Sequence, residues 1–278
     1  MPEPAVHVAE LHRFPVKSMG GERLESVALD PLGIAGDRRY AVRDLDTGKI
    51  LSGKRPSVGR VLLNCGARTD GEAVMVRVGD REFPARSGAA VDAALSTSLG
   101  VRAHLDNVAA DDETYESYWP EMEGFALSDV TVDLPIAMST EKGTFVDLAA
   151  LHLVTTSSLA HVRRLAPDSA IDVARFRPGL VLDIGEAVDG FVENDWVGRT
   201  ARLGSAVIAF GSASPRCVMT TLAQGDLPED RQVLRTLADH NRLEFAGFGD
   251  FACLGIYAEV TEPGEVRVGD ALTFLPAG

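Results

Sequence analysis

Short segments in which apolar and polar residues alternate run through the N-terminal part of the chain, at 6–14, 24–29, 58–65 and 74–78. Turns that contain glycine and aspartate, such as those at 46–49 and 79–80, separate them. Alternation with a period of two places every second side chain on one face of a sheet, so each segment is expected to be a strand. Short strands at this spacing predict a small antiparallel sheet or barrel.

Helix patterns enter later in the chain. We expect helices at 91–99, at 159–165 and at 234–240, and further strands at 206–210, 254–260 and 271–275. The segment at 159–165 follows Thr155, Thr156, Ser157 and Ser158. Hydroxyl side chains in this position are typical N-caps, and the start of a helix is also a natural seat for an anion.

The stretch at 107–146 has a different character. It is acidic, carries the aromatic residues Tyr115, Tyr118 and Trp119, and has poor periodicity. This pattern predicts a connecting segment between a first domain at 1–106 and a second at 147–278. Its carboxylates lack ordered spacing, which favours a solvated surface over a metal site.

Composition narrows the class of protein. A formal net charge of -14 over 278 residues argues against a nucleic-acid partner, because this surface repels phosphate backbones. We also expect no signal peptide and no membrane association, since no apolar run approaches the roughly 20 residues of a membrane span. The three cysteines are widely spaced, which favours free thiols in a reducing, cytoplasmic setting and excludes an iron–sulfur cluster made by this chain alone.

Cys217 is the candidate reactive residue. It follows Arg216 and precedes the hydroxyl pair Thr220 and Thr221, just after an apolar strand-like run. A neighbouring positive charge favours the thiolate, which is the form that attacks electrophiles and binds metals. The alternative is that Cys217 is a small buried hydrophobe, as most free cysteines are.

Three other basic segments could hold an anion. Lys17 and Ser18 lie in a glycine-rich turn at the end of the first expected strand, where ammonium, hydroxyl and backbone N–H groups can bind phosphate. The turn lacks the spacing of a P-loop, and a solvated turn is the alternative. Arg38 and Arg39 point to opposite faces if the backbone is extended, so at most one can face a shared site. Arg175 and Arg177 stand together before an apolar strand.

These segments together resemble the MOSC family, the molybdenum-cofactor sulfurase C-terminal domain proteins, in the form with an N-terminal β-barrel. The matching residues are Pro15-Val16-Lys17-Ser18, Arg175-Phe176-Arg177-Pro178, Arg216-Cys217 with Thr220-Thr221, and Val268-Gly269-Asp270. The sequence is similar to the mitochondrial amidoxime-reducing component and to bacterial reductases of N-hydroxylated bases. The resemblance implies a mixed α/β, β-rich fold in which an N-terminal β-barrel-like domain packs on a C-terminal MOSC β-barrel domain with a few helices.

The resemblance also implies a cofactor and its ligands. Cys217 would ligate molybdenum in the molybdenum cofactor (Mo-molybdopterin), and a cationic pocket would hold the phosphate and pterin. The residues implied for that pocket are Lys17, Ser18, Arg38, Ser157, Ser158, Arg177, Arg216 and Tyr257. Arginine suits this role because its guanidinium group bonds phosphate in a bidentate manner. No pocket of the pyridoxal phosphate type is expected.

Several positions depart from the family pattern. Pro215 stands where the reductases carry serine, Gly179 replaces a common asparagine, and 222–225 replaces an acidic residue after the threonine pair. These changes leave Cys217 in place and bear on substrate preference. No ferredoxin-like segment follows Leu275, so electrons are expected from a separate ferredoxin-, flavodoxin- or cytochrome b5-type donor.

Two functions follow from Cys217. The first is reduction of small N-hydroxylated or N-oxide substrates by a molybdenum-dependent oxidoreductase. The second is sulfur transfer, in which Cys217 carries a persulfide. A storage module without turnover and a zinc site made by Cys217, Cys253 and His240 are weaker alternatives, and His12 and His152 are expected to be core or edge residues.

Overall fold

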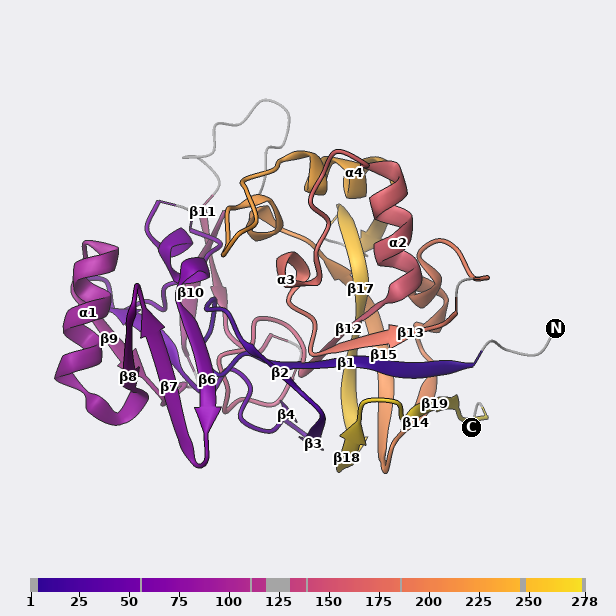
Figure 1. Ribbon diagram of the computed structural model, residues 1–278, viewed down its shortest axis with the longest axis horizontal. Helices are drawn as coiled ribbons and strands as arrows, with labels where there is room; N and C mark the ends of the chain where they lie inside the picture. The colour runs from indigo at the N-terminus through magenta and orange to yellow at the C-terminus, as the bar shows by residue number, and fades with distance from the viewer. Residues whose placement is uncertain are drawn as a thin grey trace.

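A closed barrel of seven strands, the first strand of the chain among them, forms one half of the computed structural model. The structure describes residues 5–55, 57–110, 112–118, 131–138, 140–185, 187–245 and 249–276. Each strand pairs with the next in the order β12, β13, β1, β19, β14, β15 and β17, and β17 pairs with β12 to close the ring (Figure 1). The bounds are β1 Val6–Arg13, β12 Leu151–Thr155, β13 Leu180–Asp183, β14 Thr200–Leu203, β15 Ala206–Pro215, β17 Gly249–Glu262 and β19 Ala271–Phe274. Closure removes the exposed sheet edges that would otherwise pair with other chains.

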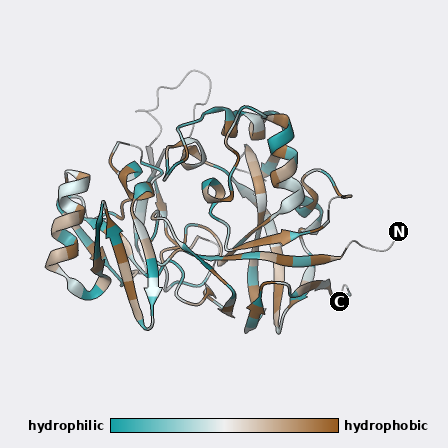
Figure 2. Cartoon of the chain, viewed as in Figure 1, coloured by the Kyte–Doolittle hydropathy of each residue, from teal (hydrophilic) through white to brown (hydrophobic). Residues whose placement is uncertain are grey.

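Alternating side chains fill the barrel, as the period-two pattern predicted. Val6, Val8 and Leu11 of β1 pack with Leu153 of β12 and Ile256 of β17 in one buried cluster. Figure 2 shows apolar residues at intervals along these strands. Two strands extend the sheet beyond the ring: β2 (Glu22–Leu24) pairs with β1, and β16 (Arg242–Phe245) pairs with β17.

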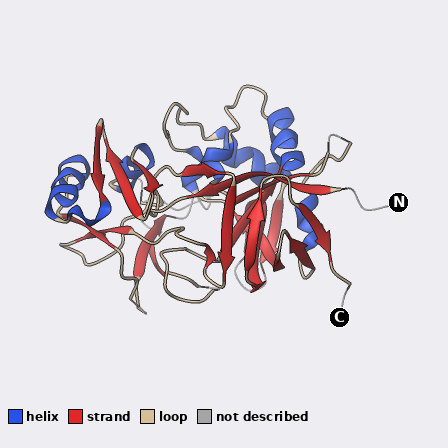
Figure 3. Ribbon diagram, turned by 60° about the horizontal axis from the view of Figure 1, so that its bottom comes forward, coloured by secondary structure: helices blue, strands red, loops and turns tan. Residues whose placement is uncertain are grey.

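Helices cover one end of the barrel. They are α2 (Thr156–Leu165), α3 (Val173–Phe176) and α4 (Gln232–His240), with the 3₁₀ turns η4 (Val192–Trp196) and η5 (Val218–Thr221) beside them (Figure 3). Thr155 is the N-cap of α2 and its side chain accepts a hydrogen bond from the Ser158 backbone N–H, which confirms the capping prediction. The helix expected at 234–240 is also confirmed.

The N-terminal half consists of small sheets around a second core. The elements are β3 Ser26–Asp30, β4 Gly33–Ile34, β5 Ala41–Asp44, η1 Gly59–Asn64, β6 Gly66–Asp70, β7 Ala73–Val78, β8 Arg81–Pro84, η2 Ala85–Ser87, α1 Ala89–Leu99, β9 Ala103–Asp106, β10 Thr114–Tyr118 and β11 Thr131–Pro135. The three-stranded sheet β6-β7-β8 packs against α1, and β5 pairs with β9. The C-terminal strand β18 (Gly264–Arg267) returns to pair with β3. The prediction of a β-rich mixed fold with two packed parts is confirmed.

One expected strand is wrong. The segment at 58–65 forms the 3₁₀ turn η1 instead. Its glycine explains the difference: a Cβ atom on Gly59 would lie 1.8 Å from the Ser52 carbonyl oxygen, so the chain packs backbone against backbone there. The expected strand at 24–29 is divided into β2 and β3.

The first strand links the two halves. β1 lies between β13 and β19, so a segment of the predicted first domain is part of the barrel formed by the second. The boundaries at 106 and 146 stay a prediction, and Trp119, within the expected connection, lies outside the described residues. Among the described residues, no helix is both long and apolar enough to cross a membrane.

Candidate functional site

Cys217 lies where the two halves meet. It follows β15, caps η5 and is half-buried, whereas Cys65 and Cys253 are buried. η5 packs on the N-terminal half through Met219, which contacts Leu63 and the backbone of Gly53. The thiol of Cys217 is therefore the one cysteine sulfur of the chain's three that stands at a partly open junction.

The threonine pair stabilises the turn that carries this cysteine. The Thr220 hydroxyl donates to the Cys217 carbonyl over 3.0 Å, and the Thr221 hydroxyl donates to the Val218 carbonyl over 2.8 Å. Arg175 holds the same turn from the other side. The residue is 1% exposed, and its guanidinium donates to four carbonyl oxygens, those of residues 170, 220, 222 and 228. Arg175 thus has a structural role.

Arg177 differs from Arg175 although it stands only two residues away. Its backbone is left-handed, with φ of 54°, and its side chain is 9% exposed. The guanidinium carbon lies 4.2 Å from the centre of the Phe14 ring, but the buried Nη2 atom has no hydrogen-bond partner in the described structure. Burial, and then the charge of Arg38, lower the pKa of Arg177 to about 9. A buried N–H donor that has no acceptor in the protein is available to bind an anion.

Arg38 lies next to Arg177. It forms an ion pair with Asp37, donates to the Arg177 carbonyl over 3.4 Å, and lies 5.0 Å from the Phe14 ring centre. Asp37 also accepts from the Phe14 backbone N–H. Arg39 is exposed, so Arg38 is the arginine of the pair that contacts the turn at Arg177. The backbone here is a turn with φ of 45° at Arg38 rather than the extended chain assumed from the sequence.

Arg216 is directed to the end of α3. Its guanidinium donates to the Phe176 carbonyl over 3.0 Å and to the Ser214 hydroxyl, and it lies 3.4 Å from the Tyr257 hydroxyl oxygen. Two arginines, Arg38 and Arg216, therefore bond to consecutive carbonyls at the turn that carries Arg177. Arg216 is half-buried, and its bonds position the strand end next to Cys217.

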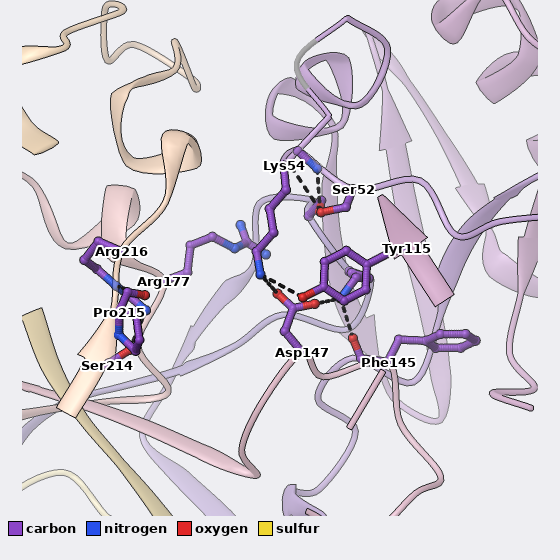
Figure 4. Close-up of polar contacts among 12 residues, drawn as sticks. Ser52, Lys54, Tyr115, Phe145, Asp147, Arg177, Ser214, Pro215 and Arg216 are labelled. Atoms are coloured by element: carbon purple, nitrogen blue, oxygen red, sulfur yellow. Dashed lines mark hydrogen bonds and ion pairs between the residues drawn. The ribbon is translucent and has the colours of Figure 1, made fainter. Parts of the chain in front are cut away.

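A second cationic group lies on the N-terminal side of the junction (Figure 4). The Lys17 ammonium group donates to Asp147 and to the Phe145 carbonyl, the latter over 2.9 Å. The Lys54 ammonium group lies 3.0 Å from the other Asp147 oxygen and donates to the Tyr115 hydroxyl over 3.0 Å. One carboxylate is thus shared by two lysines.

Burial sets the protonation of this group. It lowers the pKa of Lys17 to about 8 despite the opposing effect of Asp147. Burial also disfavours the charged form of Lys54, but the charge of Asp147 and the interaction with the Tyr115 hydroxyl outweigh it and hold the pKa of Lys54 well above its usual value. Burial opposes ionisation of Asp147 too, yet the two lysines keep the pKa of that carboxyl well below its usual range. At pH 7 both lysines and Asp147 are charged.

Ser18 supports the loop that carries Lys54. Its backbone has φ of 65°, its side chain is buried, and its hydroxyl oxygen accepts the Gly53 N–H over 3.1 Å. The turn at Lys17 and Ser18 is therefore an ordered part of the junction, whereas a solvated turn was the alternative from sequence.

Ser157 and Ser158 have partners of their own. The Ser157 hydroxyl donates to the carbonyls of Val188 and Gly190, and the Ser158 hydroxyl donates to the buried carboxylate of Glu193 over 2.6 Å. Glu193 therefore occupies the anion seat at the start of α2. The described contacts do not bring these two serines to the basic side chains.

His152 is buried next to Tyr257. Burial, and then the charge of Arg216, keep its pKa well below the usual value, so the imidazole is neutral. Its ring centre lies 5.6 Å from that of Tyr257. The prediction that His152 is a core or edge residue is confirmed, since its side chain is buried. His12 is half-buried on β1 and pairs with Glu10.

The zinc alternative gains no support. Within the ranges that the structure describes, no three His, Cys, Asp or Glu side chains lie close enough together to hold a metal ion. Cys253 is fully buried, and burial raises the pKa of its thiol to about 12. This environment suits a core residue rather than a metal ligand.

The site therefore carries an excess of positive charge in a chain of net charge -14. The site has two carboxylates, those of Asp37 and Asp147, against five basic side chains. The basic residues are Lys17, Lys54, Arg38, Arg177 and Arg216. The effect of Arg38 on the pKa of Lys17, and of Asp147 on that of Arg177, places these groups in one electrostatic neighbourhood. The residues present fit a strongly anionic group beside Cys217.

Sequence reasoning missed Lys54, Tyr115 and Asp147. Lys54 has a detectable signature, because Ser52-Gly53-Lys54 combines the same residue types as the turn at Lys17. Tyr115 and Asp147 have none, since they lie in or next to the stretch of poor periodicity.

Comparison with protein families decides the identity of the fold. A family model for the MOSC domain matches residues 140–273, and one for the MOSC N-terminal beta barrel domain matches residues 5–119. The chain belongs to the MOSC family. The family expected from the sequence is thereby confirmed, and membership relates this MOSC protein to molybdenum-cofactor biology.

Solved structures and curated sequences add little to this assignment. The chain is similar to the YUAD protein from Bacillus subtilis at 10% identity, with 99% of this chain and 97% of that one covered and a TM-score of 0.48. It is similar to YiiM from Escherichia coli at 18% identity, with 47% and 56% covered and a TM-score of 0.32, and to YiiM from Geobacillus stearothermophilus at 14% identity, with 59% and 74% covered and a TM-score of 0.33. No curated protein sequence matches this MOSC chain.

Proposed function

We propose that this MOSC protein is an oxidoreductase that binds the molybdenum cofactor at the junction and reduces N-hydroxylated or N-oxide compounds. The observation that carries the proposal is the half-buried Cys217 thiol beside a cationic group whose Arg177 has an unpartnered, buried donor. The bound cofactor would supply two-electron oxygen-atom transfer, chemistry that no side chain provides.

The chain's residues would divide the work of binding. Cys217 would be the protein ligand of the metal, since thiolate is a preferred ligand for soft metal centres. Arg177 and Arg38 would hold the phosphate, because both guanidinium groups lie within 5.0 Å of the Phe14 ring centre and one keeps a free N–H donor. Lys17 would add a positive charge, and Arg216 and Tyr257 would fix the segment before Cys217.

The partners stay predictions. We propose that the substrate is a small molecule and that a separate ferredoxin-, flavodoxin- or cytochrome b5-type protein delivers electrons. A cytoplasmic location, and the absence of nucleic-acid and membrane partners, are expected from composition alone.

Metal and pterin content test the proposal directly. Protein made in cells that supply the cofactor is analysed for molybdenum by inductively coupled plasma mass spectrometry and for released pterin by fluorescence. Near-stoichiometric content in the wild type and in Cys65→Ala, lost in Cys217→Ala, would support the assignment. Cys217→Ala protein that still binds metal and still reduces benzamidoxime would refute it.

Sulfur transfer is a second candidate, favoured by one observation: Cys217 alone among the three cysteines is not buried. Its thiolate would take the outer sulfur from a desulfurase persulfide and leave the donor cysteine as a thiolate. Mass spectrometry of the Cys217 peptide after incubation with a cysteine desulfurase and cysteine decides this candidate, which an unmodified peptide would exclude.

A further inference from the structure

Lysine is rare in this chain, and two of its four lysines belong to the site. The sequence holds four lysines, Lys17, Lys49, Lys54 and Lys142, among 27 basic residues. Lys17 and Lys54 lie on the two sides of Asp147, with side chains only 5% and 14% exposed. Both ammonium groups also lie 4.8 Å from the centre of the Tyr115 ring.

The charges in this group do not balance. Asp147 neutralises one of the two lysines, and the Tyr115 hydroxyl stays neutral because burial raises its pKa well above the usual value. One positive charge therefore remains in a largely buried setting, where an unpaired ion is costly. Binding an anion relieves that cost.

Lys54 is the lysine with a donor to spare. Its ammonium group has three N–H donors, of which Asp147 and Tyr115 accept two. The described structure gives the third no acceptor. Lys17, in contrast, donates to both Asp147 and the Phe145 carbonyl and is more deeply buried.

Lys54 is held in place relative to Cys217. Its loop is bonded on one side, where the Gly53 N–H donates to Ser18, and is packed on the other, where a Cβ on Gly53 would lie 3.0 Å from the Met219 side chain. Met219 belongs to η5, the turn that Cys217 caps. Figure 4 shows the Arg177 side chain extending toward Lys54 and Asp147 from the side away from Tyr115.

We propose that Lys54 is a further anion-binding residue of the junction, positioned by Asp147 and Tyr115, and that it contacts an anionic part of the bound cofactor on the Cys217 side. This inference rests on the proposed cofactor function. It adds a residue from the loop at 52–54 to a site otherwise built from the Lys17 turn and the barrel.

Cofactor retention tests the inference without relying on turnover. Wild type, Lys54→Met, Lys54→Arg, Tyr115→Phe and the exposed control Lys142→Met are loaded in the same cells and dialysed. Molybdenum and pterin per folded protein are then measured. We expect Lys54→Met to weaken retention about tenfold or more, as loss of a charge-assisted bond does, and Lys54→Arg and Lys142→Met to retain the cofactor. Tyr115→Phe, which only frees the ammonium group, should weaken retention several-fold.

The possible outcomes are distinct. Equal retention in Lys54→Met and wild type overturns the inference, and a raised KM in that fully loaded variant would place Lys54 at the substrate instead. If Lys54→Met does not fold, Tyr115→Phe decides, because wild-type retention in that variant overturns the positioning role. A wild type that holds neither metal nor pterin overturns the proposed function itself, and the inference with it.

Discussion

Replacing Arg177 with methionine should stabilise the protein when no cofactor is bound and weaken its hold on the cofactor. Burial lowers the pKa of Arg177 from 12.5 to about 9. Each pKa unit corresponds to about 1.36 kcal/mol, so the charged side chain costs up to about 5 kcal/mol in the folded state. Methionine fills a similar volume without charge, and it adopts the same left-handed backbone at equal cost.

Two terms reduce the expected gain. The contact between Arg177 and the Phe14 ring, at 4.2 Å, is lost, which costs about 0.5–2 kcal/mol. Replacing buried ions by apolar groups has generally yielded about 1–4 kcal/mol. We therefore expect a net stabilisation of about 2 kcal/mol. The full effect applies at pH 7, because arginine is protonated in both the folded and the unfolded state there. Above pH 9 the folded protein releases the proton first, so the advantage of the variant shrinks as pH rises.

Urea unfolding of cofactor-free protein at pH 7 measures this effect. The control is Arg175→Met. It removes the same charge two residues away, but from a guanidinium group that makes four hydrogen bonds to the protein. The expected result is a higher midpoint for Arg177→Met and a lower one for Arg175→Met, with unchanged slopes. Destabilisation of Arg177→Met by more than about 1 kcal/mol would refute the reasoning, because it would mean that the buried guanidinium is already satisfied by the protein.

Three further outcomes follow from the contacts of buried charged groups. Arg175→Met should lose about 3–5 kcal/mol in urea unfolding, because four carbonyls, two of them in buried hydrogen bonds, lose their donor, and a loss below 1 kcal/mol would contradict the structural role. Glu193→Ala should lose about 3 kcal/mol, since two hydroxyls and the Gly255 N–H lose one acceptor, and unchanged thermal melting would argue against that network. The free energy of unfolding of the wild type should rise relative to that of Lys17→Met by up to about 1.4 kcal/mol per pH unit from pH 8 to pH 10. In this range the folded state releases the Lys17 proton while the unfolded state keeps it. A constant difference between the two proteins would contradict the lowered pKa.

The barrel and its caps could be predicted because local patterns determine them. The alternating segment at 6–14 became β1, and the hydroxyl run before 159 became the cap of α2. The segment at 58–65 could not, because its conformation depends on a backbone contact between Gly59 and Ser52 that no periodicity encodes. Tertiary packing overrode the strand propensity there.

The site shows the same division. The cationic character of the junction was predictable, since the basic motifs stand in order along the chain. The different roles of Arg175 and Arg177 were not, because adjacent arginines look alike until the acceptors around each are known. The hydroxyl run at Ser157 and Ser158 predicts an anion seat, but Glu193, thirty-five residues beyond Ser158, supplies the anion from within the chain. The family's assignment of these serines to the cofactor stays a prediction.

The place of β1 in the barrel constrains how the chain is assembled during synthesis. Val6 pairs with Leu272, so β1 is synthesised long before β19, the strand that pairs with one of its edges. Closing so long a loop is slow, and meanwhile the apolar face of β1 is open to wrong partners. The two halves of this protein therefore do not fold one after the other as independent units. Expression of residues 147–278 alone would leave a gap in the ring between β13 and β19.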